Sequence, residues 1–245
     1  MSDAGEARRR SLAARAWRFR CGVEREAEVR FARLAGWLEA QGAAGRLVAL
    51  ARRSSSDEAR HALRCADLAR AFGAGVDDLP PPEPALLAPP DLPARTRMLY
   101  EAVAACCVTE TGSVGVLATL LGEVKGGSLR RTLRELARDE VRHAQLGWAV
   151  LAAEGERSQA SLLSPWVPAM LAGSIDAGLF GAAAPGDDDD GLLELGLLPQ
   201  RLRREVFVRT TLDVVLPGLE AGGIDPGPAR HWLAQRTDPG QRLSS

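Results

Sequence analysis

The sequence predicts an all-α protein: a four-helix bundle with one long crossover, followed by accessory helices. Three observations lead to this prediction. Apolar residues recur three and four positions apart almost throughout the 245 residues, and alternating β-branched runs are missing. Short glycine-containing turns divide two pairs of long periodic segments, and a proline-rich stretch separates the pairs. We expect the bundle to occupy residues 12–155 and a helical extension, residues 156–245, to pack on it within the same domain.

The four long periodic segments cover roughly residues 12–40, 44–73, 95–122 and 127–154. Because the turns at residues 41–45 and 122–127 are short, the segments on either side of each turn should form an antiparallel hairpin. Beyond residue 155 the periodicity weakens. Helices are expected there at residues 160–182, 198–219 and 228–236, with an acidic loop at residues 186–190.

The connection between the two hairpins is different in kind, because residues 79–93 include seven prolines and cannot continue a helix. At about 3.1 Å per residue, about 20 extended residues reach roughly 60 Å. A helix of about 28 residues is only about 42 Å long. The connection can therefore run the full length of the bundle, as a single long crossover requires.

Composition excludes several classes of protein. Hydrophobic residues make up 46% of the chain and charged residues 26%, which is typical of a soluble globular protein. A net charge of −1 argues against a protein that mainly binds nucleic acid or an anionic membrane. No run of 18 or more uncharged apolar residues is present, so no membrane span is expected. The cysteines form no C-x-x-C pair and no signal peptide is recognisable, so a reduced, cytoplasmic location is expected.

One five-residue motif occurs twice. Residues 57–61 and 139–143 both read D-E-x-R-H, and each copy places a Glu and a His three positions apart, on one face of a helix. The chain has only three histidines, so composition alone does not account for the repeat. The motif places Glu58 and His61 on the second long helix, and Glu140 and His143 on the fourth.

A constant offset relates the two hairpins. Adding 82 to the numbers of Glu58 and His61 gives Glu140 and His143, and adding 82 to Glu28 gives Glu110. Glu28 and Glu58 are equally far from the first turn, and Glu110 and Glu140 are equally far from the second, so each pair should lie at one height. Glu24 lies on the same apolar stripe as Glu28 and is the alternative on the first helix, but the height count favours Glu28.

The Glu and His of each motif and the two further glutamates all fall on core-facing stripes, where an unpaired carboxylate is very costly. Two divalent or trivalent cations would neutralise four such carboxylates. Four carboxylates and two imidazoles suit iron or manganese better than zinc. The predicted metal ligands are Glu28, Glu58, His61, Glu110, Glu140 and His143, with Glu58 and Glu140 the better candidates to bridge two ions.

This pattern resembles the ferritin-like superfamily of di-iron carboxylate proteins, in which two helices each supply a Glu and two others each supply Glu-x-x-His. The D-E-x-R-H form is similar to that of bacterial multicomponent monooxygenase hydroxylases and related oxygen-activating members. The resemblance implies two iron ions, with manganese or a mixed centre as alternatives. It also implies that Asp57 and Asp139 hydrogen-bond the metal-bound imidazoles, while Arg60 and Arg142 balance the charge.

The same resemblance implies an enzyme, a non-haem di-iron oxidase or oxygenase that uses O2 and an external electron donor on a small organic substrate. Its catalytic carboxylates would be Glu28, Glu58, Glu110 and Glu140. The alternative is a ferroxidase or a peroxide-scavenging protein of the rubrerythrin or ferritin kind. A metal-free helical interaction module is a third class. An apolar pocket beside the metals would favour the oxygenase, and the sequence leaves the assembly open, a homodimer included.

Several further residues have two interpretations. Gly112, Ser113 and Gly147 are expected either to line a substrate pocket, with a local widening of the helix near the metals, or to allow close helix packing. The cysteines flank the predicted site and are expected to be core residues rather than redox groups. His231 is either a seventh ligand or, as we expect, a surface residue. Tyr100, about 15 Å along its helix from Glu110, is not expected to store a radical.

Overall fold

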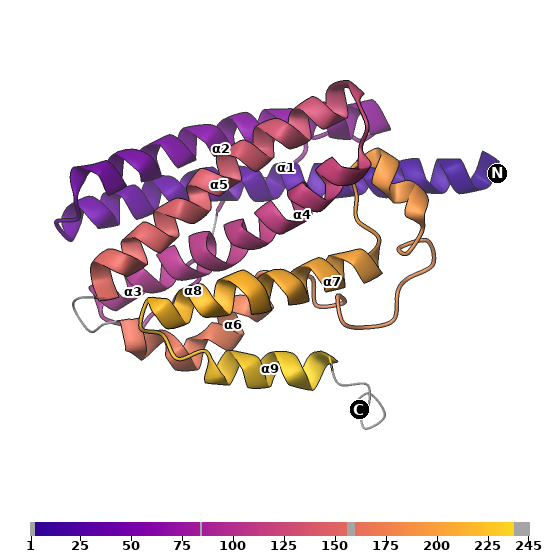
Figure 1. Cartoon of the computed structure of the whole chain (residues 1–245). Helices are drawn as coiled ribbons and strands as arrows, with labels where there is room; N and C mark the ends of the chain where they lie inside the picture. Colours follow the sequence, from indigo (N-terminus) through magenta and orange to yellow (C-terminus); the bar gives the residue numbers. More distant parts are fainter. Residues whose placement is uncertain (1–2, 84, 156–159, 238–245) are drawn as a thin grey trace.

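The computed structural model describes residues 3–83, 85–155 and 160–237, and these residues form helices, turns and loops without a strand. The first hairpin consists of α1 (Asp3–Ala40) and α2 (Gly45–Phe72), which pack along each other. Gly73 ends α2 in the left-handed region, with a φ of 106°, and its N–H caps the last turn. The predicted all-α bundle is confirmed (Figure 1).

The second hairpin begins with one continuous helix in three parts. These parts are α3 (Ala94–Ala102), the π-helical segment η1 (Val103–Glu110) and α4 (Thr111–Glu123). The chain then returns through α5 (Gly127–Gly155), which packs on η1, on α4 and on α2. The four long segments expected from the apolar spacing therefore exist, although α1 begins nine residues earlier than the expected residue 12.

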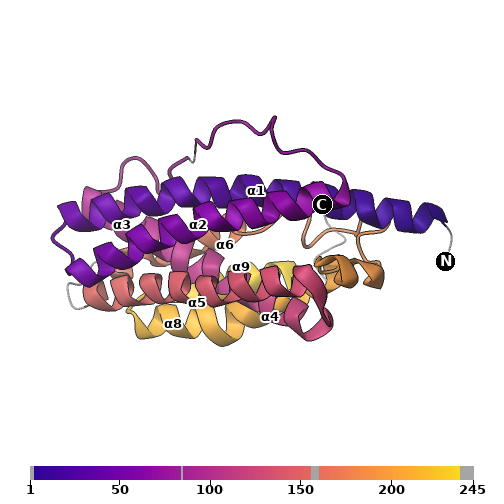
Figure 2. The ribbon, with the colours of Figure 1, turned by 90° about the horizontal axis from the view of Figure 1, so that it is seen from above.

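The proline-rich crossover runs along the outside of α1 (Figure 2). Arg18 of α1 donates to the carbonyl of Gly75 and to Asp78 at the start of the crossover. Further along, the backbone N–H groups of Leu87 and Ala88 donate to Glu101 Oε1 over 2.6 and 3.1 Å. Glu101 is almost fully buried, so α3 holds the crossover through a carboxylate that accepts two backbone hydrogen bonds.

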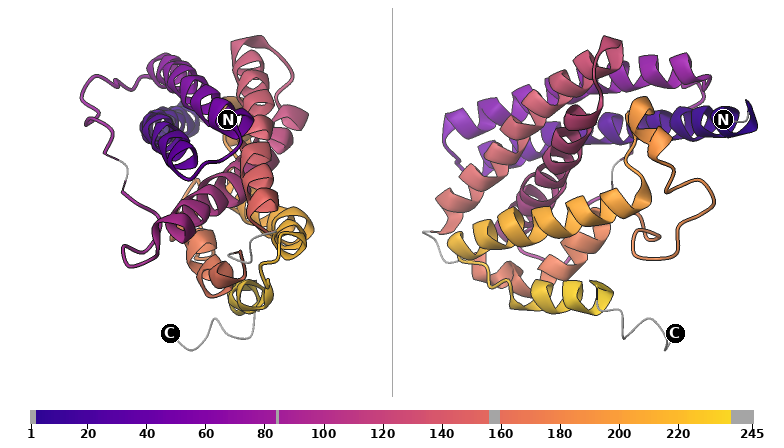
Figure 3. Two further views of the ribbon diagram at one scale, coloured as in Figure 1. Left: turned by 90° about the vertical axis from the view of Figure 1, so that its left-hand side faces the viewer. Right: turned by 45° about the vertical axis from the view of Figure 1, so that its right-hand side comes forward.

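The C-terminal part of the chain covers the side of the bundle formed by α3, η1 and α4 (Figures 1 and 3). It consists of the 3₁₀ segment η2 (Ala160–Trp166), α6 (Val167–Gly173), the 3₁₀ segment η3 (Asp190–Leu195), α7 (Gln200–Thr210), the π-helical η4 (Thr211–Val215), α8 (Leu216–Ala221) and α9 (Gly227–Thr237). The helix expected at residues 160–182 is wrong in its second half, because α6 ends at Gly173 and Asp176 then accepts from the N–H of Gly178 in a turn.

The helix Ala94–Glu123 is the one described helix that is long and apolar enough, by length and composition, to cross a membrane. Of its most apolar stretch, 56% is buried inside the protein. The central helix of a helical bundle meets the same criteria, and this helix carries the buried Glu110 in its interior.

The apolar core is divided into two clusters. One, which includes Phe31, Leu99 and Val150, lies toward the turn between α1 and α2. The other, which includes Trp17 and Leu136, lies toward the opposite end of the bundle. Between the two clusters the bundle interior holds a layer of buried acidic and imidazole side chains. The four long helices of the bundle surround this polar layer.

Candidate metal centre

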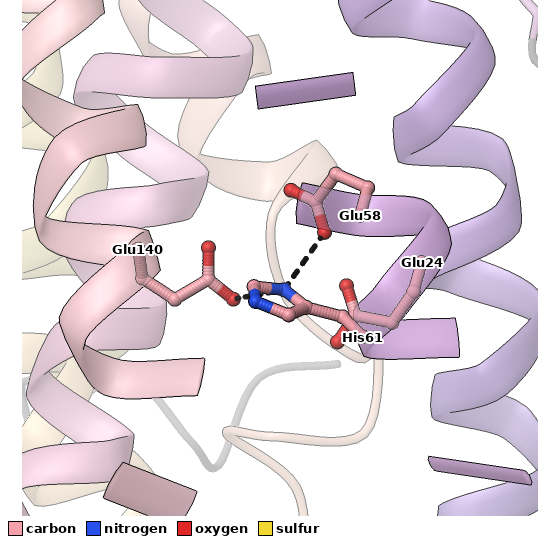
Figure 4. Close-up of side chains that lie close together, drawn as sticks. All are labelled: Glu24, Glu58, His61 and Glu140. Carbon is pink, nitrogen blue, oxygen red and sulfur yellow. Dashed lines mark hydrogen bonds and ion pairs between the residues drawn. The ribbon is translucent and has the colours of Figure 1, made fainter. Parts of the chain in front are cut away.

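Six ionisable side chains meet in the polar layer, and the four long helices of the bundle all contribute. They form two overlapping groups whose ligand atoms lie within 4.8 Å of one another: Glu24, Glu58, His61 and Glu140, and Glu58, Glu110, Glu140 and His143. All six are buried, with exposed fractions of at most 7%. Glu58 and Glu140 belong to both groups, so each could bridge two metal positions, as expected from their motif. Figure 4 shows the first group, with the Glu140 carboxylate reaching from α5 toward the imidazole of His61.

Both imidazoles turn Nδ1 into the layer. His61 Nδ1 lies 3.1 Å from Glu58 Oε2 and 3.8 Å from Glu140 Oε1. His143 Nδ1 lies 2.9 Å from Glu140 Oε2 and 3.0 Å from Glu58 Oε1. Phe31 packs against the ring of His143, with 5.0 Å between the ring centroids. Nδ1 is therefore the imidazole atom that could bind a metal ion in each case.

The Nε2 atoms point the other way, to aspartates of the opposite hairpin. His61 Nε2 lies 3.3 Å from Asp139 Oδ2, and His143 Nε2 lies 3.6 Å from Asp57 Oδ2. The first contact is a hydrogen bond, whereas the second is a longer ion-pair contact, and His143 Nε2 has no hydrogen-bond partner within the described residues. A carboxylate beside the outer nitrogen of a metal-binding imidazole fixes its tautomer and orientation. The structure thus places Asp57 and Asp139 beside the imidazoles, as the resemblance implies, and adds that the pairing crosses between the hairpins.

Two arginines of the repeated motif join these aspartates. Arg60 Nη2 lies 2.8 Å from Asp57 Oδ1 and 2.5 Å from Asp139 Oδ2. Arg142 donates to Asp139 and lies 3.3 Å from Asp57 Oδ2. Burial disfavours ionisation of Asp139, but hydrogen bonds from Arg138 and Arg60 dominate and lower its pKa. Both aspartates are therefore held as anions, ready to accept a hydrogen bond from an imidazole N–H.

On the first helix, Glu24 occupies the place that the sequence analysis assigned to Glu28. Glu28 is only half-buried, is in neither group of potential ligands, and its backbone carbonyl accepts a hydrogen bond from Ser55. At about 100° per residue, Glu24 lies about 20° around the helix from the core residue Phe31, whereas Glu28 lies about 60° away. The choice of Glu28 is therefore corrected: the carboxylate that reaches the layer comes from about one helical turn, roughly 6 Å, further from the loop than the count from the turn indicated.

Arg20 is a site residue that the sequence analysis missed. Its Nε lies 2.7 Å from Glu24 Oε1 and its Nη2 lies 3.5 Å from Glu140 Oε1. Its Nη2 also lies 3.3 Å from the hydroxyl of Ser113. The four-residue spacing between Arg20 and Glu24 on one helix was the available signal. Arg20 places one positive charge against the carboxylates of the polar layer.

The electrostatics of the layer show that this one arginine does not balance four carboxylates. Burial, with repulsion from Glu58 and Glu140, raises the pKa of Glu24 to about 8 despite Arg20. Burial and the neighbouring carboxylates also raise the pKa of Glu110 well above its ordinary value. Burial opposes the charge on His143, but its contacts with Glu140 and Glu58 prevail and raise its pKa to about 10. Some carboxyl and imidazole groups of the layer therefore stay protonated, and bound metal cations would displace these protons.

The donor set also fits a metal. Glu58 Oε1 is buried and faces the interior of the layer, where it lies 3.0 Å from Nδ1 of His143. A carboxylate oxygen in that state is available to a cation. The buried Glu and His side chains could hold a metal ion.

Comparisons of the chain with protein families, with curated proteins and with solved structures find no match. The candidate metal centre therefore stands on the geometry of the polar layer.

A cavity of about 380 Å³ lies directly beside the layer and includes Glu24 and Glu110 in its lining. Gly112 and Ser113 also line it, in keeping with the first of their two interpretations. The remaining walls come from α1, from η1, from residues 174–179, and from α7 and η4. Most of the lining is apolar. The cavity gives an organic molecule of modest size access to the acidic groups.

Gly147 does not line this cavity, so its assignment to the pocket is corrected. A Cβ at position 147 would lie 2.5 Å from Cys106 Cβ and 2.9 Å from the backbone nitrogen of Cys107. Gly147 therefore allows α5 to pack closely on η1, which was the second of the two interpretations.

The widening of the helix lies before Glu110 rather than at the glycines after it. The π-helical segment η1 ends at Glu110, and the hydroxyl of Thr109 donates to the carbonyl of Ala104, five residues earlier. A second π-helical segment, η4, lines the same cavity from the opposite side through Thr211 and Val215. Neither segment contains a glycine or a proline, so residue type gave no signal for these segments.

The other candidate residues lie away from the centre or have packing roles. His231 is exposed and its Nε2 lies 2.8 Å from the side-chain amide of Gln235, so it is not a seventh ligand. Tyr100 packs against Trp166. The four cysteines are free and buried, as expected of core residues. Asp189 caps η3 and pairs with Arg9, in keeping with a solvated acidic loop.

Proposed function

We propose that this protein is a non-haem di-iron oxidoreductase that activates O2 to oxidise a small organic substrate. The observation that carries the proposal is the cavity of about 380 Å³, mostly apolar, that opens onto Glu24 and Glu110. A protein whose substrate is iron or peroxide needs a polar entry path, whereas an apolar pocket with a few polar groups suits an organic molecule.

The residues that would hold the iron ions follow from the two overlapping groups. Glu24 and His61 would serve one ion, Glu110 and His143 would serve the other, and Glu58 and Glu140 would lie between them. When bound, a pair of iron ions supplies the electrons and the Lewis acidity that O2 activation requires. Manganese or a mixed centre accepts the same ligands.

The chain's own residues would prepare this site in three ways. Asp139 and Asp57 would accept a hydrogen bond from Nε2 of His61 and His143, which leaves Nδ1 free to bind. The apolar clusters above and below the layer would exclude bulk water. The cavity would hold the substrate against Glu110. Because oxidation of the substrate does not by itself supply all the electrons that reduce O2 to water, an external electron donor is part of the proposal.

Iron stoichiometry is the first test. The metal-free protein is loaded with Fe(II) under anaerobic conditions, desalted and analysed for iron, in parallel with a Glu140→Ala/His143→Ala double variant. We expect about two irons per chain in the unmodified protein and a loss of iron in the double variant. A Glu26→Ala/His231→Ala variant is the matched control, because both residues are exposed and outside the layer.

The second step measures O2 consumption by the iron-loaded protein with and without organic substrates. Consumption that depends on an organic substrate and on a reductant supports the proposal. Rapid multi-turnover oxidation of Fe(II) without an organic substrate would instead assign the protein to the ferroxidases. Absence of retained iron in the first step would overturn the metal centre altogether.

A further inference from the structure

Three guanidinium groups, those of Arg20, Arg30 and Arg203, line the cavity beside the candidate metal centre. Its lining follows α1 from Phe19 to Arg30, a distance of about 16 Å at the rise of a helix, and follows α7 and η4 from Arg203 to Val215. A second cavity of about 230 Å³ shares Arg20, Val116, Asp176 and Arg203 with the first. Arg203 therefore lies where the two cavities meet.

Arg203 differs from its neighbours because it has no partner. Its Nε is buried without a hydrogen bond, and within the described residues its side chain makes no ion pair. The next residue, Arg204, donates to the carbonyls of Leu179 and Gly181, and Arg201 pairs with Asp190. A partly desolvated guanidinium without a partner is costly, and a bound anion would offset that cost.

The other charged groups of the cavity are already engaged or are less suited to this role. Arg20 is bound to Glu24. The Nε of Arg30, like that of Arg203, is buried without a hydrogen bond, but the Arg30 guanidinium makes an ion pair of 4.0 Å with Glu26. Asp176 Oδ1 accepts a hydrogen bond of 2.7 Å from the N–H of Gly178. Arg203 is thus the cation of the cavity that is most free to bind an anion.

Besides Asp176, several apolar side chains line the cavity around Arg203. They include Val116 of α4, Val206 and Phe207 of α7, and Leu179 and Ile175 of the covering loop. Gly112 and Ser113 lie between this end and Glu110. The cavity thus offers one anion-binding group at one end, an apolar length of wall, and the acidic layer beyond it.

We infer that the substrate is an amphipathic organic acid, whose carboxylate binds Arg203 and whose apolar body extends along α4 to the metal centre. This inference rests on the proposed function. The planar fork of a guanidinium matches a carboxylate with two parallel hydrogen bonds. Val116 and Glu110 are six residues apart, so the carboxylate would lie about 9 Å along the helix from the metal ligands. The part of the substrate next to the centre is therefore remote from its acid group.

Binding measurements test this inference without relying on turnover. Calorimetric titrations compare octanoate with octan-1-ol, and 4-phenylbutanoate with 4-phenylbutan-1-ol, on the metal-free protein and on the anaerobic iron-loaded protein. We expect each acid to bind at least about tenfold more tightly than its alcohol, which is the range of a hydrogen bond to a charged group. Equal affinities, or no binding by any of the four probes, would overturn the inference.

Variants locate the effect at Arg203. In Arg203→Gln the preference for the acid should disappear while the alcohol still binds, which also shows that the cavity is intact. Arg203→Lys, which keeps the charge without the fork, should retain part of the preference. Arg209→Gln is the matched control, because Arg209 lies exposed on the same helix and outside the cavity. Asp176→Asn should leave acid binding unchanged or tighter, because it removes a neighbouring negative charge.

An unchanged acid preference in Arg203→Gln would overturn the inference, and so would a folded Arg203→Gln protein that binds neither acid nor alcohol. Failure of the proposed function gives a different result. If the protein prefers acids but retains no iron, the anion site is supported and the proposed oxidoreductase function is overturned. If the protein retains iron and consumes O2 but binds acids and alcohols equally, the proposed oxidoreductase function is supported and the anion site is overturned.

Discussion

Nε2 of His61 lies 3.3 Å from Oδ2 of Asp139, a residue of the other helical hairpin. The reciprocal pair, His143 and Asp57, has a distance of 3.6 Å. Each hairpin therefore orients an imidazole that belongs to its partner. The arginines Arg60 and Arg142 each contact both aspartates, so the crossed pairs form one network across the bundle.

The first prediction concerns this network. Asp139→Asn should lower metal affinity by about 10- to 100-fold, because the imidazole of His61 loses the anion that orients it and raises its basicity. Competition with a chelator of known affinity measures the change. Asp67→Asn, an exposed position on the same helix as His61, is the control and should leave the affinity unaltered. Equal affinities of the Asp139→Asn and unmodified proteins would show that the contact does not support the metal.

The second prediction separates Glu24 from Glu28. Glu24→Gln should reduce iron content, because it removes one carboxylate from the group that includes His61. Glu28→Gln should leave iron content unchanged, because that side chain belongs to neither group. Metal analysis after desalting decides between them. Loss of iron in Glu28→Gln with normal iron in Glu24→Gln would restore the assignment made from the sequence.

The third prediction concerns the packing of α5 on η1. Gly147→Ala should destabilise the protein by about 1–3 kcal/mol, because the new Cβ would lie 2.5 Å from Cys106 Cβ and 2.9 Å from a backbone nitrogen. Thermal or urea denaturation followed by circular dichroism measures it. Gly22→Ala, in the interior of α1 with nothing within 4 Å of the added Cβ, is the control and should stabilise by about 0.5–1 kcal/mol. A stabilising Gly147→Ala would refute the close approach.

The fourth prediction concerns the cavity. A Cβ at Gly112 meets nothing within 4 Å, and this residue lines the cavity beside Glu110. Gly112→Leu should therefore fold, retain its iron and lose at least about tenfold in substrate affinity or turnover, because the larger side chain fills space that the substrate needs. Iron content measured beside kinetics separates this effect from damage to the centre. Unchanged affinity and turnover would show that the substrate does not use this space.

The repeated motif made the core of the site predictable. Two Glu-x-x-His pairs at helical spacing, a short turn in each hairpin and a crossover of sufficient length were enough to predict the bundle and to bring Glu58, His61, Glu140 and His143 into one layer. Burial follows from the same pattern, because these residues continue the apolar stripes. The aspartates and arginines of the motif were predictable from the family resemblance.

The other features of the site could not be predicted, because they depend on how the helices pack and not on the residue pattern within one helix. Glu24 and Glu28 share a stripe, and only the rotation of α1 about its axis decides which carboxylate faces the layer. The π-helical segments arise from tertiary packing without a distinctive residue type. The cavity is closed by residues 174–179 and α7, whose periodicity was weak, so its shape and the isolation of Arg203 required the packed structure.

The crossover that Glu101 holds against α3 also determines how the candidate metal centre could be assembled. Each hairpin supplies half of the ligands and the aspartate needed by the other half, so neither is a complete site by itself. Because the crossover links the two hairpins in one chain, each hairpin is at a high effective concentration near the other. Their association therefore does not depend on the protein concentration. Two separate hairpins would instead meet in a bimolecular reaction, and bound metal would act as the cross-link that opposes their dissociation on dilution.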